Sequence, residues 1–401
     1  MSETTGGTGA PRPPGSSLPS LTGMRMVAAL AVFFYHAGEL SPLPSVAAAG
    51  AFKSVFGQGG WFGVSFFFVL SGFVLTWAAR PTDTMPRFWR RRLVKVFPNH
   101  LVTLVAATVS SVVLGQTLGV WKTVANMFLL QSWDWHVDIW GGINPVSWSL
   151  SCELLFYASF PLVLRLVNRI KASRLWLWTL GTTAVIALAP TVATLVVPSG
   201  PLTFAPISEG ELWFLYAFPP IRMLEFLLGI LLARTVQQGR WIPLGLLPAT
   251  ALLLATYILS SHVGFSHGLV AVTALPIGLL IAAAAHADIN DGWSPVRGPV
   301  AVWIGKISFA FYLWHFLVLQ TMDHLWGGAA AVRSVLATTA FTALALVVSL
   351  LLSWATFNLV EEPVMRRWGS PRTRGGSTPG TPTPGGPTDP ARVGTPIALK
   401  G

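Results

Sequence analysis

Charged residues are scarce in this chain of 401 residues. Asp, Glu, Lys and Arg together make up 10% of it, whereas a soluble domain averages about 25%. Hydrophobic residues make up 53%, and the mean hydropathy is +0.61. This balance excludes an ordinary soluble domain and predicts an all-α polytopic membrane protein.

Cysteine and the common cofactor motifs are also scarce. The single Cys152 excludes an internal disulfide and a metal cluster of several cysteines. The eight histidines are scattered without ligand spacing such as HxxxH, so no metal site is predicted. The chain has no Walker loop and no GxSxG elbow. The net charge of +11 gathers at the ends of hydrophobic runs, which argues against a nucleic-acid partner and for a lipid bilayer.

Hydrophobic runs are what the chain has in abundance, and about ten are long enough to cross a bilayer. We place them at 21–40, 60–79, 99–119, 147–167, 175–197, 219–235, 242–260, 267–286, 301–322 and 332–357. The run 219–235 is barely long enough, and 121–131 is a candidate for an additional interfacial helix.

Basic residues alternate between the loops of these ten spans. One set of loops and helix ends holds Arg80, Arg87, Arg90, Arg91, Arg92, Lys95, Arg165, Arg169, Lys171, Arg174, Arg234, Arg240, Arg297, Arg366, Arg367, Arg372 and Arg374. The opposite set holds only Lys53, Lys122 and Arg333. Because positive charge marks the cytoplasmic side, the pattern predicts that both termini are cytoplasmic.

The two ends of the chain differ from the hydrophobic part in composition. Residues 1–20 are rich in Gly, Pro, Ser and Thr, and 369–401 are rich in Pro and Gly, so we expect two disordered tails. The first hydrophobic run has no charged leader and no obvious cleavage site, and we interpret it as a retained span. One transmembrane domain, residues 21–368, is therefore expected, without a second folded domain.

The first span carries two polar residues on one face. Arg25 and His36 are eleven positions apart, which is about three helical turns and about 16 Å along the axis. Titratable groups inside a membrane usually face a bundle interior or a wet cavity. The pair therefore suggests a passage with a cationic end and a proton-transfer end. The alternative is an interfacial anchor at Arg25 and a buried core histidine at His36.

Other titratable residues fall inside the spans. The topology places His36, Glu153, Arg222, Glu225 and His315 at similar depth in the outer half, with Arg25 and Lys306 lower. A histidine beside carboxylates is suited to act as a general base near neutral pH. Arg222 and Glu225 are three residues apart, so the alternative for them is a simple ion pair.

The basic residues at the cytoplasmic mouth and the tryptophans also have two interpretations. A basic mouth suits a phosphorylated co-substrate. Arg90, Arg91 and Arg92 would alternatively set the topology or meet anionic lipid. Trp133 and Trp135 are interpreted as part of an aromatic belt at the membrane interface.

Seven segments resemble, in order over roughly residues 18 to 368, motifs of the acyltransferase-3 family of integral membrane acyltransferases. They are SLTGMRMVAALAVFFYHAG, GWFGVSFFFVLSGFVL, FWRRRLVKVFP, NPVSWSLSCELLFY, IRMLEFLLGILLA, GKISFAFYLWHFLVL and FNLVEEPVMRRW. The first contains the Arg, ten residues, then His of the family's first helix, and FWRRRLVKVFP resembles its basic loop before span three. The order and spacing of all seven carry the resemblance.

The resemblance implies a function and a set of site residues. It implies transfer of an acyl group, often acetyl, from acyl-CoA to a hydroxyl of a sugar or similar acceptor, in a bacterial plasma membrane and without a bound cofactor. His36 is implied as the catalytic histidine, Arg25 as its partner in the first helix, and Glu153 as the acidic residue of the fourth span. The acyl-CoA entrance is implied at Arg91, Arg92 and Lys95. For substrate binding we expect Arg222, Glu225, His315 and Trp148.

Two positions depart from the family pattern. Ser65 stands where the family often has Asp, so no catalytic role is assigned to it. Lys95 replaces the last Arg of the RRxxR pattern, which keeps the charge but loses the bidentate fork. We also expect a stand-alone form without a fused extracytoplasmic esterase-like domain.

The acceptor divides into two hypotheses. One is a surface or lipid-linked glycan. The other is a hydroxyl or sugar of a secondary metabolite such as a macrolide antibiotic, because the form WSLSCELLFY and the Pro/Gly-rich tails resemble members from high-GC actinobacteria. A competing function class is a transporter or flippase, which ten spans and buried ionisable groups also fit. The absence of matched repeats argues against it.

Overall fold

The computed structural model describes residues 17–41, 43–80, 82–197, 200–328 and 334–369. This part is helical, with one isolated β-bridge between Pro201 and Ser208. The predicted tails lie almost wholly outside the described residues. Only their inner edges are included, and there the first helix already begins at Pro19 and the last helical turn ends at Gly369.

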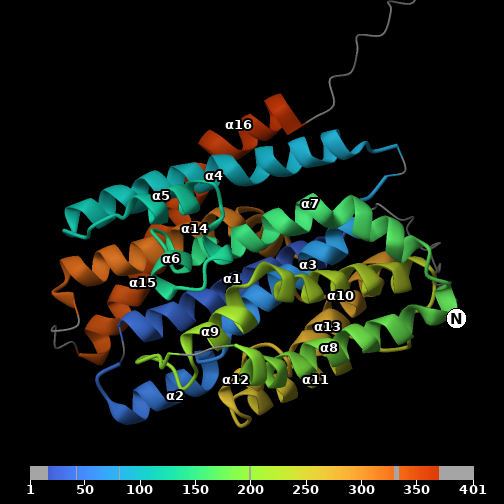
Figure 1. Cartoon of the computed structure of the whole chain (residues 1–401), viewed down its shortest axis with the longest axis horizontal. Coiled ribbons are helices and arrows are strands. Elements are labelled where there is room, and N and C mark those ends of the chain that lie inside the picture. The colour runs from blue at the N-terminus through green and yellow to red at the C-terminus, as the bar shows by residue number, and fades with distance from the viewer. Residues whose placement is uncertain (1–16, 42, 81, 198–199, 329–333, 370–401) are drawn as a thin grey trace, which may run out of the picture.

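Long helices form most of the molecule (Figure 1). They are α1 (Pro19–Leu40), α3 (Gly59–Trp77), α4 (Met85–Val113), α7 (Trp148–Asn168), α8 (Leu175–Val196), α10 (Pro219–Gln237), α13 (Ala274–Ile289), α14 (Pro299–Leu325) and α15 (Val335–Thr356). Shorter α-helices are α2 (Val46–Phe56), α5 (Val120–Met127), α6 (Val137–Trp140), α9 (Glu209–Leu212), α11 (Leu246–Ser260), α12 (Phe265–Leu269) and α16 (Glu362–Val364). The 3₁₀ turns are η1 (Gln131–Trp133), η2 (Pro145–Ser147) and η3 (Ala172–Arg174), and the π turns are η4 (Trp213–Ala217), η6 (Phe357–Glu361) and η7 (Met365–Gly369).

Local sequence explains where several helices begin. The first turns of α1, α4, α10 and α14 contain proline, whose fixed φ suits a helix start and whose missing N–H would be unpaired there in any case. The helices α2 and α15 follow Ser45 and Ser334, whose side chains accept hydrogen bonds from Ala48 N and Ala337 N. These local signals fix the residue at which each of these six helices begins.

The prediction of an all-α membrane protein is confirmed, with one difference in the number of spans. Nine helical segments of the described residues are long and apolar enough to cross a membrane. The expected span 242–260 forms α11, which has only 15 residues. At 1.5 Å per residue such a helix is about 22 Å long, short of the roughly 30 Å hydrocarbon core. The orientation of the termini remains a prediction.

The basic segment before the third span is helical, where we expected a loop. Residues 87–95 form the first turns of α4, which has 29 residues and continues through Pro98. At 1.5 Å per residue α4 is about 43 Å long, so it exceeds the roughly 30 Å hydrocarbon core and its basic part extends past it. Arginine, leucine and lysine are good helix formers, and Pro86 starts the helix. The candidate helix 121–131 is shorter than expected: α5 ends at Met127, and its interfacial position remains a prediction.

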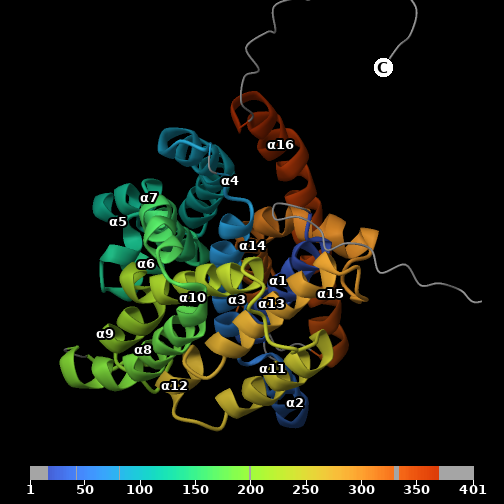
Figure 2. The ribbon, with the colours of Figure 1, turned by 90° about the vertical axis from the view of Figure 1, so that its right-hand side faces the viewer.

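Helices α1, α3, α10, α13 and α14 occupy the centre of the bundle when it is viewed end-on (Figure 2). The closest packing joins α3 to α10 and α1 to α14. Helices α3 and α10 approach each other at Gly72 and Gly229, where a Cβ would lie 2.0 Å from Phe226 O and from Val69 O respectively. Larger residues at these two positions would separate the helices and the side chains between them.

The two ends of the bundle differ in chemistry. At one, here called the basic end, the start of α4 meets the ends of α3 and α7, and Arg80, Arg91, Arg92 and Arg165 line a common groove. At the other, the opposite end, Trp61 at the start of α3 packs on Tyr35 near the end of α1 and on Tyr216 of η4, with ring centroids 5.5 and 4.5 Å apart. Arg25 lies toward the basic end of α1 and His36 toward the opposite end.

Candidate active site

A cavity of about 110 Å³ lies between α1, α3, α4, α7 and α14 in the basic half of the bundle. Its polar lining is supplied by Arg25, Ser71, Arg92, Lys95, Ser149, Glu153, Tyr157, Ser308 and Tyr312. Three cations and one carboxylate thus surround a space too small for a whole coenzyme but wide enough for a thin chain or an acyl group. Of the predicted catalytic residues, Arg25 and Glu153 are in this cavity.

Arg25 is held on the wall of the cavity by α14 and α3. Its Nε donates a hydrogen bond to Ser308 Oγ at 3.0 Å, and Ser308 Oγ in turn donates to Gly305 O at 2.8 Å. The guanidinium carbon lies 5.8 Å from the centre of the Phe67 ring. Arg25 thus lines the cavity with its guanidinium held in place from α14 and α3.

Glu153 lies among the cations of the cavity. Its Oε2 accepts a hydrogen bond of 2.6 Å from the hydroxyl of Tyr157, one helical turn further along α7. We expected Glu153 in the outer half beside His36. The structure instead places it with Arg25 and Arg92 around the cavity. Glu153 is thus separated from His36, which is paired with His315 instead.

The three predicted acyl-CoA residues of α4 have different surroundings. Arg92 lines the cavity, with its guanidinium 5.5 Å from the Phe88 ring, and its buried Nε has no hydrogen-bond partner among the described residues. Lys95 also lines the cavity, but it forms an ion pair with Glu361. Arg91 lines the separate groove of the basic end and donates to Asp83 Oδ1 at 2.9 Å. Arg92 is therefore the cation best placed for an anionic ligand at the cavity.

The ion pair of Lys95 ties α4 to the end of the chain. Glu361 is buried and also accepts a hydrogen bond from Asn99, one turn further along α4. Neither Glu361 nor Asn99 was among the predicted site residues, although the segment FNLVEEPVMRRW contains Glu361. The available signal was a carboxylate at the point where the apolar run of the last span ends.

His36 is hydrogen-bonded to His315 of α14. The distance from His36 Nδ1 to His315 Nε2 is 3.0 Å, and His315 Nδ1 lies 2.7 Å from Tyr312 O. A carbonyl oxygen only accepts, so His315 Nδ1 carries the hydrogen and a neutral His315 accepts at Nε2. His36 then donates through Nδ1, and its Nε2 keeps a lone pair. This arrangement makes His36 Nε2 a proton acceptor.

Two aromatic rings lie between the cavity and the histidine pair. Tyr312 lines the cavity, and its ring centre is 5.7 Å from that of His315. Phe67 lies against Tyr312, with ring centres 6.0 Å apart, and under the guanidinium of Arg25. The Tyr312 hydroxyl is fixed because it donates to Val146 O at 3.0 Å and accepts from Ser149 Oγ at 3.0 Å. Phe67 and Tyr312 therefore separate the two halves of the site.

Arg222 and Glu225 form a buried ion pair away from the cavity. Arg222 Nη2 is 2.9 Å from Glu225 Oε2 and donates to Ser65 Oγ at 3.2 Å. Both side chains are about 1% exposed. Their expected convergence with His36 and Glu153 is replaced by this contact between α10 and α3. The interpretation as a simple pair describes the geometry better than a direct substrate contact.

Trp148 belongs to an aromatic row at the opposite end. It is 4% exposed, and its ring centre is 4.4 Å from that of Tyr216. Three rings of this row, Tyr216, Trp61 and Tyr35, stand between Trp148 and His36, and Trp148 does not line the cavity. In the described residues, no group of three or more His, Cys, Asp or Glu side chains is placed to hold a metal ion.

Comparison with known proteins identifies a family. The acyltransferase-3 model, described as an acyltransferase domain, matches residues 18–357. The chain is 39% identical over 363 residues to Acyltransferase MdmB of Streptomyces mycarofaciens, covering 88% of this chain and 93% of that protein. No solved structure matches it.

More distant matches are named as O-acetyltransferases. The chain is 25% identical over 387 residues to the putative peptidoglycan O-acetyltransferase YrhL of Bacillus subtilis, covering 86% of this chain and 55% of that protein. It is 24% identical over 340 residues to the peptidoglycan O-acetyltransferase OatA of Listeria monocytogenes, covering 75% and 49%. The chain thus spans about half the length of these two proteins.

Proposed function

This chain belongs to the acyltransferase-3 family and is a multi-pass membrane acyltransferase, and from this membership we propose that it transfers an acyl group, typically acetyl, from acyl-CoA to a hydroxyl group of a sugar-bearing acceptor. The observation that carries the proposal is the hydrogen-bonded pair of His36 and His315 beyond a cation-lined cavity.

The histidine pair supplies the general base. The chain of hydrogen bonds from Tyr312 O through His315 holds His36 with a lone pair on Nε2. His36 Nε2 removes the proton of the acceptor hydroxyl as the oxygen attacks the thioester carbonyl. The carbon–sulfur bond breaks, the acyl group leaves on the acceptor oxygen, and the coenzyme A thiolate takes up the proton. His315 acts as a positioning residue, as the carboxylate does in a Ser-His-Asp triad.

The cations supply the donor site. Phosphate groups of acyl-CoA would contact the arginines of the basic end, with Arg92 Nε as a buried donor that is unpaired in the described part of the chain. The pantetheine arm would extend along the cavity past Arg25. Glu153 balances the charge of these cations and is held by the Tyr157 hydroxyl. Coenzyme A is a co-substrate in this scheme, and no bound cofactor is required.

The thioester has to pass Phe67 and Tyr312 to reach His36. The cavity ends at these two rings, and the histidine pair lies behind Tyr312. A rotation of Phe67 would open the passage without breaking a hydrogen bond, whereas Tyr312 is held by two. Phe67 is therefore the moving part in this proposal.

Two classes of acceptor fit the proposed reaction. Relatives named as peptidoglycan O-acetyltransferases support a glycan, although they are matched over only about half of their length. The alternative acceptor is a macrolide-type secondary metabolite of antibiotic biosynthesis. Gene neighbourhood distinguishes them: glycan assembly genes favour the first, and polyketide synthase and glycosyltransferase genes the second.

The test is release of free thiol from acetyl-CoA by the protein in membranes. We expect wild-type protein to release thiol and His36→Ala to lose on the order of 10²–10⁴ in rate. His262→Ala, which removes an exposed histidine, is the matched control. Equal rates for wild type and a folded His36→Ala protein would contradict the mechanism. Absence of release, together with a requirement for a proton gradient, would favour the transporter hypothesis.

A further inference from the structure

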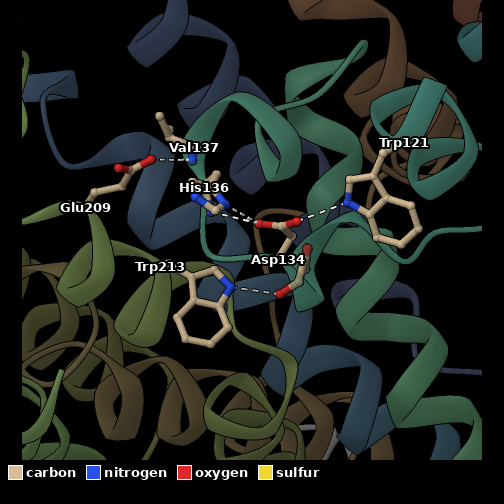
Figure 3. Close-up of polar contacts among 7 residues, drawn as sticks. Trp121, Asp134, His136, Val137, Glu209 and Trp213 are labelled. Carbon is tan, nitrogen blue, oxygen red and sulfur yellow. Dashed lines mark hydrogen bonds and ion pairs between the residues drawn. The ribbon is translucent and has the colours of Figure 1, made fainter. Parts of the chain in front are cut away.

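A cluster at the opposite end of the bundle plays no part in the acyl transfer described above (Figure 3). It consists of Trp121 of α5 and of Asp134, Trp135 and His136, which lie between η1 and α6; we call it the indole–imidazole cluster. The segment that holds it follows the end of α4 and precedes the start of α7. It therefore lies at the same end as His36, away from the arginines proposed for the donor.

Asp134 organises the cluster. Its Oδ1 accepts hydrogen bonds from His136 N at 3.1 Å and from His136 Nδ1 at 2.7 Å, and its Oδ2 accepts one of 3.0 Å from Trp121 Nε1. Figure 3 shows the carboxylate between the imidazole and the indole. Because His136 Nδ1 is directed to the carboxylate, Nε2 is the nitrogen that remains for a ligand.

The segment is anchored on both sides. Val137 N donates to Glu209 Oε1 of α9 at 2.6 Å, and Trp213 Nε1 donates to Ser132 O at 2.9 Å (Figure 3). Ser132 Oγ donates to Trp148 O at 2.8 Å, at the start of α7. A loop with these contacts holds its side chains in place before a ligand arrives, which lowers the entropic cost of binding.

The rings of the cluster are open to the outside although the loop is fixed. Trp121 is 54% exposed and Trp135 45%, and the side chain of His136 is 50% exposed. The Trp135 and His136 rings lie with centres 4.0 Å apart. A tryptophan of a membrane belt typically points its N–H to water or headgroups. The N–H of Trp121 donates to Asp134, so the exposed face of its ring is the part that can contact a ligand.

A row of aromatic rings leads to His36 from Trp148, the residue whose carbonyl accepts the hydrogen bond of Ser132. Below the segment, Trp148 contacts Tyr216, Tyr216 contacts Trp61, and Trp61 contacts Tyr35, with ring centres 4.4 to 5.5 Å apart. The Tyr35 ring centre is 5.0 Å from that of His36. A molecule bound at the cluster would lie at the same end of the bundle as His36, the base of the proposed reaction.

We propose that the indole–imidazole cluster binds the sugar portion of the acceptor. The C–H face of a pyranose ring is apolar and packs on an indole face, while its hydroxyls need polar partners at the edge, which Asp134 and His136 supply. Exposed ring faces next to a fixed carboxylate–imidazole pair match this combination. The inference rests on the proposed function, since it locates the acceptor of that reaction.

Binding to purified protein in nanodiscs tests the proposal directly, with chitotetraose as the glycan probe and erythromycin A as the glycosylated macrolide probe. We expect wild type to bind one of them by titration calorimetry. Trp135→Ala should weaken that binding roughly fivefold to tenfold. His136→Gln, which keeps an N–H donor for Asp134, should weaken it by a smaller factor. Trp293→Ala, which removes a tryptophan that is 79% exposed in the connection between α13 and α14, is the control and should not change it.

The outcomes separate this proposal from the proposed function. Thiol release that depends on His36, measured on the same preparations without either probe, tests the acyltransferase mechanism alone. If wild type binds neither probe, or if Trp135→Ala and Trp293→Ala bind them equally, the subsite is refuted while the mechanism stands. A Trp135→Ala protein that incorporates poorly into nanodiscs but binds with unchanged affinity would identify the cluster as part of an interfacial belt, and would also refute it.

Discussion

His36 Nδ1 and His315 Nε2 are 3.0 Å apart, which joins α1 to α14 through two imidazole rings. The backbone carbonyl of Tyr312 fixes the hydrogen on His315 Nδ1, and this determines the tautomer of both rings. A histidine that accepts a hydrogen bond thereby takes the place that a carboxylate often has beside a catalytic base. We therefore expect His315 to hold the His36 ring in the orientation that acyl transfer requires.

Replacement of His315 by Ala should lower kcat for acyl transfer by about tenfold to a hundredfold, because His36 loses the acceptor that holds Nδ1–H. His315→Gln, whose side-chain carbonyl can accept the same hydrogen bond, should recover part of the rate. The measurement is acceptor-dependent thiol release with the pH profile of kcat. A purely structural role would lower the amount of folded protein without a difference in kcat between the two variants.

Replacement of Arg92 by Ala should raise KM for acetyl-CoA by roughly tenfold to a hundredfold, since a hydrogen bond from a charged group contributes about 1.5–3 kcal/mol. Arg91→Ala should have a smaller effect, because Arg91 is already paired with Asp83. Steady-state kinetics at two salt concentrations measures both. Equal increases of KM in the two variants would show that Arg92 contributes no more to donor binding than Arg91 does.

Replacement of Phe67 by Trp should slow acyl transfer and leave donor binding in place. The larger ring takes up part of the cavity beside Tyr312, and overpacking of about 1–3 kcal/mol corresponds to a loss of roughly fivefold to a hundredfold in kcat. Acetyl-CoA affinity, measured by calorimetry, should stay close to that of wild type. If kcat is unchanged, the thioester does not pass between Phe67 and Tyr312.

Replacement of Lys95 by Ala should destabilise the protein by on the order of 1–3 kcal/mol, because it leaves the buried Glu361 carboxylate without its cation. Glu361→Gln combined with Lys95→Met should be less harmful than Lys95→Ala alone. The thermal unfolding midpoint in one detergent gives the order of the variants. A double variant less stable than Lys95→Ala would contradict the ion-pair account.

The segment 131–140 should lose protection at alkaline pH. The hydrogen bond to Asp134 raises the pKa of the exposed His136 above its ordinary 6.5, with Glu209 and Asp138 adding to it. The contribution of imidazolium is therefore complete below pH 6.5 and is lost as pH rises through the higher folded-state pKa. Hydrogen exchange of this segment, corrected for intrinsic rates, should show protection that falls as the pH rises above 6.5. His136→Gln should remove the dependence.

Most of the helices could be predicted from the sequence because a bilayer requires long apolar runs with internally paired backbones. The basic segment at the start of α4 could not be predicted as helix in this way. The apolar run does not extend over it, although the helix does. The span expected at 242–260 was overestimated for a related reason. Apolar length was counted there, while the helix itself begins only at Leu246.

Several residues of the candidate site could be predicted from the sequence, but their partners could not. Spacing on a single helix predicted that Arg25 and His36 share a face, and the motifs drew attention to Glu153, Arg92 and Lys95. Spacing carries no information about which neighbouring helix meets a given face. The partners of these residues, Ser308, His315, Tyr157 and Glu361, are between 4 and 283 positions away in the chain.

The sequence by itself determined that this protein is an all-α membrane protein of a recognisable family, because composition, run length and ordered motifs are local properties of the chain. Only the tertiary structure decided that Glu153 lies with the cations while His36 lies with His315, and that Phe67 and Tyr312 stand between them. The physical reason is that helix packing, with close approaches such as Gly72 against Phe226 O, sets rotation and depth of each helix. Those two quantities decide which titratable groups meet.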